Sequence, residues 1–185
     1  MRISPQGIKN MAIEFTSFVR ADYENSPEYA LVGEVAEGLL AHLREPEAQQ
    51  LIADANLPGH SSALVQAAAL AGATKFGFVS EAKGLFAEYA TSALRPDYFL
   101  RVGATGILLE IERGKTTINN MDLLDFWKCH LCQQANYLFL MVPRELRQNP
   151  TMAPRKEYAF VVKRLASFFK PGNYTNVHAL FVFGY

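Results

Sequence analysis

Three acidic residues stand close together in a segment where their types and spacing suit metal chemistry. Asp97 precedes an apolar run over residues 98–102, and Glu110 and Glu112 end a second run over residues 107–112. A glycine-containing turn joins the two runs, so the segment predicts a β-hairpin. Because side chains alternate between the faces of a strand, Glu110 and Glu112 point the same way. Carboxylates grouped like this suit a hard cation such as Mg²⁺ or Mn²⁺.

The rest of the chain predicts the elements that must position these acids. Ser26-Pro27 is typical of a helix start, with Ser as N-cap and Pro at the first helical position. The nearly continuous apolar run over residues 136–142 indicates a strand buried on both faces. We expect helices over residues 28–43, 45–55, 61–73, 119–134 and 156–169, a second hairpin from strands 76–80 and 85–89, and further strands at 136–142 and 177–183. The fold class is therefore α/β in the mixed α+β sense, a central mixed sheet flanked by helices.

The helix predicted after the acidic hairpin has a clear apolar stripe. Along residues 119–134, Leu123, Trp127 and Leu131 fall at four-residue spacing and predict the face that packs on the sheet. Lys128 is the neighbour of Trp127 in that helix. An ordinary surface lysine is one interpretation of this residue.

Pro96-Asp97 followed by Glu110-x-Glu112 resembles the signature of the PD-(D/E)xK nuclease superfamily, which includes restriction endonucleases, junction resolvases and repair nucleases. The order of elements over residues 28–183 also resembles the restriction-endonuclease-like core of that superfamily. The resemblance implies that Asp97, Glu110 and the backbone carbonyl of Ile111 bind Mg²⁺. This chain departs from the pattern in carrying Glu112 where Lys is commoner, which leaves open how water is activated and whether the site turns over.

The resemblance implies catalytic roles for the residues that follow Glu110. Glu112 would bind a second ion or accept a hydrogen bond from the attacking water. Arg113 and Lys115 would grip the phosphate, Arg by a bidentate fork and Lys as a point charge. A solvated strand exit is the other interpretation of these two cations.

The same resemblance allows Lys128, on the helix after the hairpin, to lend a polar side chain to the site. It also allows an acid from the first core helix to join the metal ligands. Glu34 and Glu37 lie three apart on one face of that helix, outside its apolar stripe. Either acid could serve as a ligand, and an exposed helix surface is the alternative for both.

Charge is divided unevenly along a chain whose net charge is zero. Residues 1–94 hold 6 Lys/Arg and 11 Asp/Glu, whereas residues 95–185 hold 12 and 7. This asymmetry favours a polyanion-facing surface in the second half. Four cations surround one loop and form either a surface that follows a nucleic-acid duplex or an ordinary solvated loop: Arg144, Arg147, Arg155 and Lys156.

Several other classes of site are disfavoured. Cys129-His130-x-Cys132 has no second Cys/His pair to complete a zinc site, and two cysteines are too few for a disulfide scaffold. No glycine-rich phosphate loop is present, so no nucleotide cofactor is expected. No apolar run predicts a membrane span or a secretory signal, so we expect a cytoplasmic protein without membrane contact. We expect one domain over residues 1–185, with an N-terminal extension at 1–27 and a core at 28–183.

Two functional hypotheses of different class follow. The first is a Mg²⁺- or Mn²⁺-dependent endonuclease that hydrolyses DNA phosphodiester bonds, either restriction-endonuclease-like or a repair or resolvase nuclease. A homodimer would let it cut both strands, and DNA over RNA is an expectation from the resemblance alone. The alternative is a catalytically inactive domain of the same fold that binds nucleic acid or serves protein assembly. A third, weaker hypothesis is an unrelated α/β protein in which Glu110 and Glu112 form an exposed strand edge.

Overall fold

A mixed β-sheet forms the centre of the structure, a computed structural model that describes residues 13–56, 62–80, 84–86, 89, 94–114, 116–146 and 153–185. Within those residues the strands are β1 (Glu14–Val19), β2 (Val79–Ser80), β3 (Tyr98–Val102), β4 (Thr105–Ile111), β5 (Tyr137–Val142) and β6 (Ala179–Gly184). Their order across the sheet is β1-β6-β5-β4-β3-β2. Strands β4, β5 and β6 run parallel, and the remaining pairings are antiparallel.

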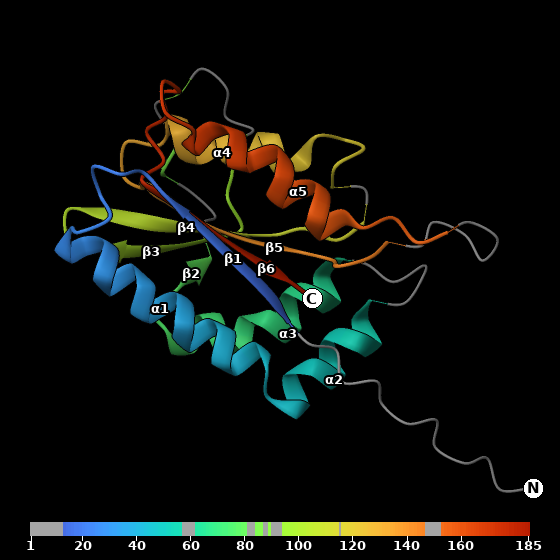
Figure 1. Cartoon of the computed structure of the whole chain (residues 1–185). Helices are drawn as coiled ribbons and strands as arrows, with labels where there is room; N and C mark the ends of the chain where they lie inside the picture. The colour runs from blue at the N-terminus through green and yellow to red at the C-terminus, as the bar shows by residue number, and fades with distance from the viewer. Residues whose placement is uncertain are drawn as a thin grey trace, which may run out of the picture.

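Helices cover both faces of this sheet (Figure 1). One layer contains α1 (Pro27–Leu43), α2 (Pro46–Ala55) and α3 (Ser62–Lys75). The other contains α4 (Met121–Leu131) and α5 (Glu157–Leu165), which continues as the 3₁₀ turn η1 (Ala166–Phe169). The predicted mixed sheet flanked by helices is confirmed. No helix in the described residues is long and apolar enough to cross a bilayer.

Strand β4 separates two apolar cores, and all seven of its residues are buried. Ile107 and Leu109 belong to the core shared with α1 and α3, whereas Leu108 belongs to the core beneath α4 and α5. This is the alternation that the sequence predicted for the strand. It directs Glu110, two residues after Leu108, toward α4.

Helix α1 begins as its sequence predicts. The Ser26 hydroxyl accepts a hydrogen bond from the backbone N–H of Tyr29 at 3.0 Å, and Pro27 occupies the first turn. Leu39 and Leu43 are fully buried against the sheet, whereas Leu31 is 51% exposed.

The predicted β3–β4 hairpin is present, with a shorter turn. Val102 pairs with Thr105, which leaves only Gly103 and Ala104 in the loop. Gly103 adopts φ +56°, the left-handed conformation that tight hairpin turns require and that glycine adopts without strain.

The second predicted hairpin, from residues 76–80 and 85–89, is wrong. β2 contains only Val79 and Ser80 and pairs with β3, and the described residues of 84–89 form turns and bends. Leu85 and Phe86 are instead buried in the core beneath α4 and α5. Their apolar character therefore reflects burial in a loop. The edge strand β1, in the segment expected to be an extension, was not predicted.

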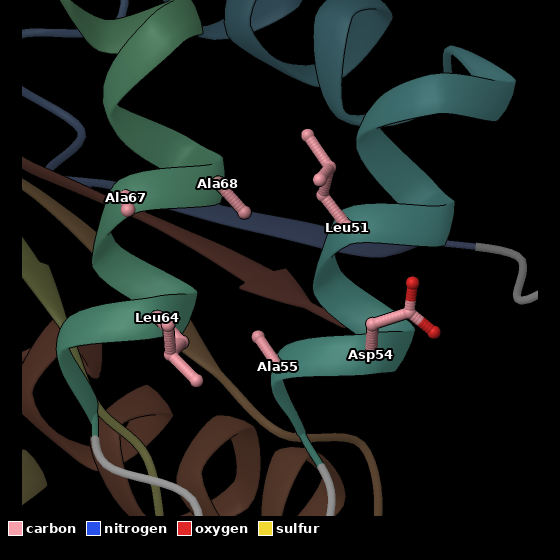
Figure 2. A pocket seen from close by; sticks show the side chains of 6 residues that line it. All are labelled: Leu51, Asp54, Ala55, Leu64, Ala67 and Ala68. Atoms are coloured by element: carbon pink, nitrogen blue, oxygen red, sulfur yellow. The ribbon is translucent and has the colours of Figure 1, made fainter.

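Helices α2 and α3 pack side by side and leave an apolar groove on the helical layer opposite α4. Figure 2 shows side chains of the two helices converging on this groove. Its lining residues are Leu51, Asp54 and Ala55 of α2 and Leu64, Ala67 and Ala68 of α3. The helix predicted over residues 61–73 is α3, which continues two residues further, to Lys75.

Candidate carboxylate site

Asp97 and Glu110 lie in direct contact where β3 and β4 meet. The register pairs Tyr98 with Leu109, so the preceding Asp97 is placed opposite Glu110. The backbone N–H of Asp97 donates to Glu110 Oε2 at 3.2 Å, and the N–H of Ile111 donates to Asp97 Oδ2 at 2.9 Å. Glu110 is only 2% exposed, which contradicts the hypothesis that it belongs to an exposed strand edge.

Helix α4 supplies a cation and another carboxylate to this pair. Lys128 Nζ donates to Glu110 Oε1 at 3.1 Å and to Asp125 Oδ1 at 2.8 Å. Asp125 is fully buried and Lys128 is 7% exposed. We call Asp97, Glu110, Glu112, Asp125 and Lys128 the carboxylate cluster.

Glu112 stands at the end of β4 with its backbone held on both sides. Its N–H donates to the carbonyl of Met141 at 2.9 Å, and its own carbonyl accepts the Tyr185 hydroxyl at 2.6 Å. The side chain is half-buried and interacts with Asp125 and Lys128. Residues at the C-terminal ends of β5 and β6 thus hold the backbone of Glu112 in place.

Burial and repulsion from neighbouring carboxylates raise the pKa values of Glu110, Glu112 and Asp125. Burial and the nearby Asp125 raise the pKa of Glu112 to about 8, and Lys128 only partly opposes them. The pKa of Glu110 is raised well above its usual value by the same causes. Burial raises that of Asp125 to about 6. Burial alone would lower the pKa of Lys128, but the carboxylates of Glu110 and Asp125 outweigh it and raise that pKa.

The cluster contains four carboxylates and one ammonium, that of Lys128. Asp125 Oδ2 is buried and has no hydrogen-bond donor among the described residues. Carboxylate and carbonyl oxygens are the ligands that Mg²⁺ and Mn²⁺ prefer. Among the residues that the structure describes, no three Asp, Glu, His or Cys side chains converge closely enough to hold an ion. Lys128 lies between Glu110 and Asp125, and its positive charge offsets the repulsion between the two carboxylates.

Sequence reasoning missed Asp125 and misoriented α4. The predicted packing face contains Trp127, which is 51% exposed, and Leu131, which is 39% exposed. The face that is buried instead contains Asp122, Asp125 and Lys128. Charged residues repeated every three positions on one helix face were the signal that could have identified it.

The structure does not bring every predicted site residue to the cluster. Glu34 and Glu37 are exposed on α1, which covers the opposite face of the sheet from α4. Lys128 is not a surface lysine, because it is buried and paired with carboxylates. Lys115 and Arg147 lie outside the described residues. Ile111 lies within the site, between Glu110 and Glu112.

The remaining predicted cations are near the edge of the sheet formed by the C-terminal ends of β4, β5 and β6, where Glu112 lies. Arg144 follows β5 and pairs with Glu14 at 2.7 Å, and its backbone N–H bonds the carbonyl of Tyr185. Arg155 Nε is 3.1 Å from the buried Glu157. Arg113 is half-buried and Lys156 is exposed. These cations are therefore partly committed to contacts within the protein.

A second buried polar network joins the segment after Glu112 to α5. Glu157 Oε2 accepts hydrogen bonds from the Thr117 N–H at 3.1 Å and from the Thr117 hydroxyl at 2.7 Å. Arg164 donates to Asp122 at 3.1 Å and to the Thr117 carbonyl at 3.3 Å. The network fixes the start of α4, and hence the helix that presents Asp125 and Lys128.

Comparison with known proteins adds a structural likeness. No protein-family model and no curated protein sequence matches the chain. A crystal structure of the restriction endonuclease BglII complexed with a DNA 16-mer is similar, with a TM-score of 0.51 and 14% sequence identity. The match covers 94% of this chain and 78% of the BglII chain. At this identity the likeness concerns the fold, which is restriction-endonuclease-like.

Proposed function

We propose that this protein is a metal-dependent endonuclease of the PD-(D/E)xK superfamily that hydrolyses DNA phosphodiester bonds. The observation that carries the proposal is the direct contact between Asp97 and Glu110, joined by Lys128 and Asp125 from α4. A group of buried acids costs stability unless a cation neutralises it, and acids with strongly shifted pKa values cluster at functional sites. Its position in a restriction-endonuclease-like fold supports phosphodiester hydrolysis over other metal-assisted reactions.

Asp97, Glu110 and the Ile111 carbonyl would hold Mg²⁺ or Mn²⁺. Because no three acids of the described residues converge on one point, Glu112 or Asp125 would move closer to complete the ligands. The buried Asp125 Oδ2, which has no donor among the described residues, fits this role. The ion would neutralise charge on the scissile phosphate and lower the pKa of a bound water. A divalent cation bound among these acids would favour their ionised forms and so lower the raised pKa values of Glu110 and Glu112.

Lys128 would take the part that the unusual Glu112 leaves open. Its ammonium is fixed by Glu110 and Asp125 and is aimed into the cluster. From there it would stabilise negative charge developing on the phosphate. Glu112 would accept a hydrogen bond from the attacking water and take up its proton as general base.

Nucleic acid would approach along the edge of the sheet where β4, β5 and β6 end. Arg113, Arg144, Arg155 and Lys156 lie in the segments that leave this edge. Phosphate contacts from Arg and Lys supply most of non-specific affinity for nucleic acid. Lys115 and Arg147 remain candidates for the same role, and a cytoplasmic location remains an expectation.

The test is cleavage of supercoiled plasmid and of branched and single-stranded DNA in Mg²⁺ or Mn²⁺. Asp97→Asn and Glu110→Gln should abolish cleavage and weaken metal binding measured by calorimetry. Glu47→Gln, an exposed acid on α2, is the matched control and should cut like the wild type. Metal-independent cleavage, or full activity in both cluster variants, would exclude this mechanism.

The inactive-module hypothesis predicts a different pattern in the same experiment. Wild-type protein would bind DNA or a partner without cutting any substrate in the panel. The departure at Glu112 is the feature that favours this alternative, because the strand position that commonly carries Lys is acidic. Failure to bind either metal would support it further.

A further inference from the structure

A small polar pocket adjoins the carboxylate cluster at Asp97. It is a cavity of about 200 Å³ lined by residues from three segments: Gln66 of α3, Ser80 of β2, and Arg95, Pro96, Asp97 and Tyr98 at the start of β3. Sites for drug-sized molecules usually enclose about 300–1,000 Å³. This pocket is therefore better suited to a single chemical group than to a separate small-molecule ligand.

The groups that line the pocket are mostly hydrogen-bond donors. Arg95 carries a guanidinium, Gln66 an amide and Ser80 a hydroxyl, all of which can donate to an anion. An Arg fork matches the geometry of phosphate oxygens. Asp97 is the acidic member of the lining, and it accepts the Ile111 N–H within the cluster. The pocket therefore favours a phosphate group on its Arg95 side.

The sheet fixes the pocket relative to the proposed reaction. Ser80 pairs with Tyr98 in the β2–β3 ladder, and Asp97 immediately precedes Tyr98. The sheet therefore places Ser80, which lines the pocket, close to Asp97. Asp97 belongs to the cluster and also lines the pocket. A nucleic-acid strand whose scissile phosphate lies at the cluster would pass the pocket with a neighbouring phosphate.

We infer that Arg95, assisted by Gln66 and Ser80, binds a backbone phosphate of the nucleic acid next to the one that is cut. This inference rests on the proposed function and adds a positioning contact to it. The pocket would hold the strand in place, while the cluster on the other side of Asp97 acts on the adjoining phosphodiester. Arg95 is assigned to substrate binding and takes no part in the bond-breaking step.

The first experiment compares the steady-state kinetics of Arg95→Gln with wild type on the oligonucleotide that wild type cuts best. A lost charged contact should raise KM about tenfold, with kcat within about twofold. The salt dependence of binding should also fall by about one counterion. Arg101→Gln is the matched control, since Arg101 is exposed toward the turn end of β3 and should leave KM unchanged.

Two further variants guard against a merely structural effect. Gln66→Glu approaches the same pocket from α3, keeps the side-chain shape and adds a negative charge, so it should also raise KM. Arg95→Lys keeps the positive charge and should recover part of the affinity. Unchanged KM in both Arg95→Gln and Gln66→Glu would overturn the inference.

A second experiment identifies the phosphate. Oligonucleotides would carry a neutral methylphosphonate at each backbone position in turn, and their affinity for wild type and Arg95→Gln would be compared. One position beside the cut should weaken binding to wild type and have no further effect on Arg95→Gln, as coupled contacts do. Additive losses at every position would overturn the inference.

The two proposals fail in different ways. If wild type cuts DNA and Asp97→Asn abolishes cutting, but the pocket variants behave as wild type, only the pocket's role is wrong. If wild-type protein neither binds nor cuts any nucleic acid in the panel, the proposed function fails and the pocket's role fails with it.

Discussion

Lys128 is the residue on which the electrostatics of the cluster depend. It is the ammonium within hydrogen-bond reach of both Glu110 and Asp125. Taking charges out of water is costly, and the cost is offset only where the buried charges neutralise one another. The arrangement of one cation among several acids leaves net negative charge, which agrees with the raised pKa values of Glu110, Glu112 and Asp125.

Replacing Lys128 should therefore destabilise the fold in a pH-dependent manner. We expect Lys128→Met to lower the free energy of unfolding by about 3 kcal/mol at pH 8, where an unpaired buried charge remains. At pH 5 the loss should be smaller, because protonation can neutralise the acids. Urea unfolding at both pH values measures the difference, with the exposed Lys163→Met as control. Equal losses at both pH values would argue against this electrostatic account.

The pKa of Glu112 gives a second prediction. Its folded value of about 8 lies above the ordinary 4.5, so between those values the folded state binds more protons than the unfolded state. The free energy of unfolding should therefore fall as pH rises through this window and level off above about 8. Glu112→Gln should make stability depend less on pH between pH 6 and 8. Melting temperatures measured without metal across this pH range would show the difference from wild type.

Metal should reverse this trend, because it binds the ionised acids. Mg²⁺ should raise the wild-type melting temperature more at pH 8 than at pH 6. A melting temperature that does not respond to Mg²⁺ or Mn²⁺ at either pH would count against a metal role for Glu112 and its neighbours.

At the scale of elements, the hairpin could be predicted from the sequence because its signals are local. Asp97, the glycine turn and the alternation of Leu108 and Glu110 all lie in one continuous segment, residues 97–110, and strand register then fixes the contact between Asp97 and Glu110. The edge strand β1 was missed because its pairing with β6 joins residues far apart in the sequence. Leu85 and Phe86 were assigned to a strand because apolar character does not distinguish a ladder from a buried loop.

The orientation of α4 could not be obtained from apolar periodicity. Leu123, Trp127 and Leu131 form a clear stripe, yet Asp125 and Lys128 occupy the buried face. Periodicity assumes that apolar side chains determine the buried face. Here the buried face is determined by the ion pair and hydrogen bond with Glu110. Glu110 belongs to β4, so the apolar pattern of α4 by itself does not reveal this contact.

The network between Thr117 and Glu157 makes a prediction about the attachment of α4. Thr117→Val removes the hydroxyl donor 2.7 Å from the fully buried Glu157 and leaves that oxygen only the backbone N–H. We expect a loss of about 2 kcal/mol in the free energy of unfolding, typical of a buried bond to a charged group. Thr117→Ser keeps the hydroxyl and should lose much less in urea unfolding. Equal stability of Thr117→Val and wild type would contradict the assignment.

At the scale of the whole molecule, the two helical layers differ in their surfaces. The layer of α1, α2 and α3 presents exposed acids such as Glu34, Glu37 and Glu47, which would repel nucleic acid. The sheet edge with Arg144 and Lys156 lies beside the cluster. The uneven charge along the sequence thus corresponds in part to an uneven distribution around the fold.

The outward face of α4 leads to a prediction about assembly. It exposes 40% of Leu124, 51% of Trp127 and 39% of Leu131, with Ile118 nearby at 43%. Large apolar side chains gathered on one helix favour an interface, and a symmetric pair of chains would place two clusters on one duplex. We expect light scattering to show a dimer for the wild type and a monomer for Trp127→Glu. This substitution leaves the buried face of α4 unchanged. The variant should nick plasmid where wild type cuts both strands in one binding event. A monomeric wild type that still cuts both strands together would require another arrangement of the two active sites.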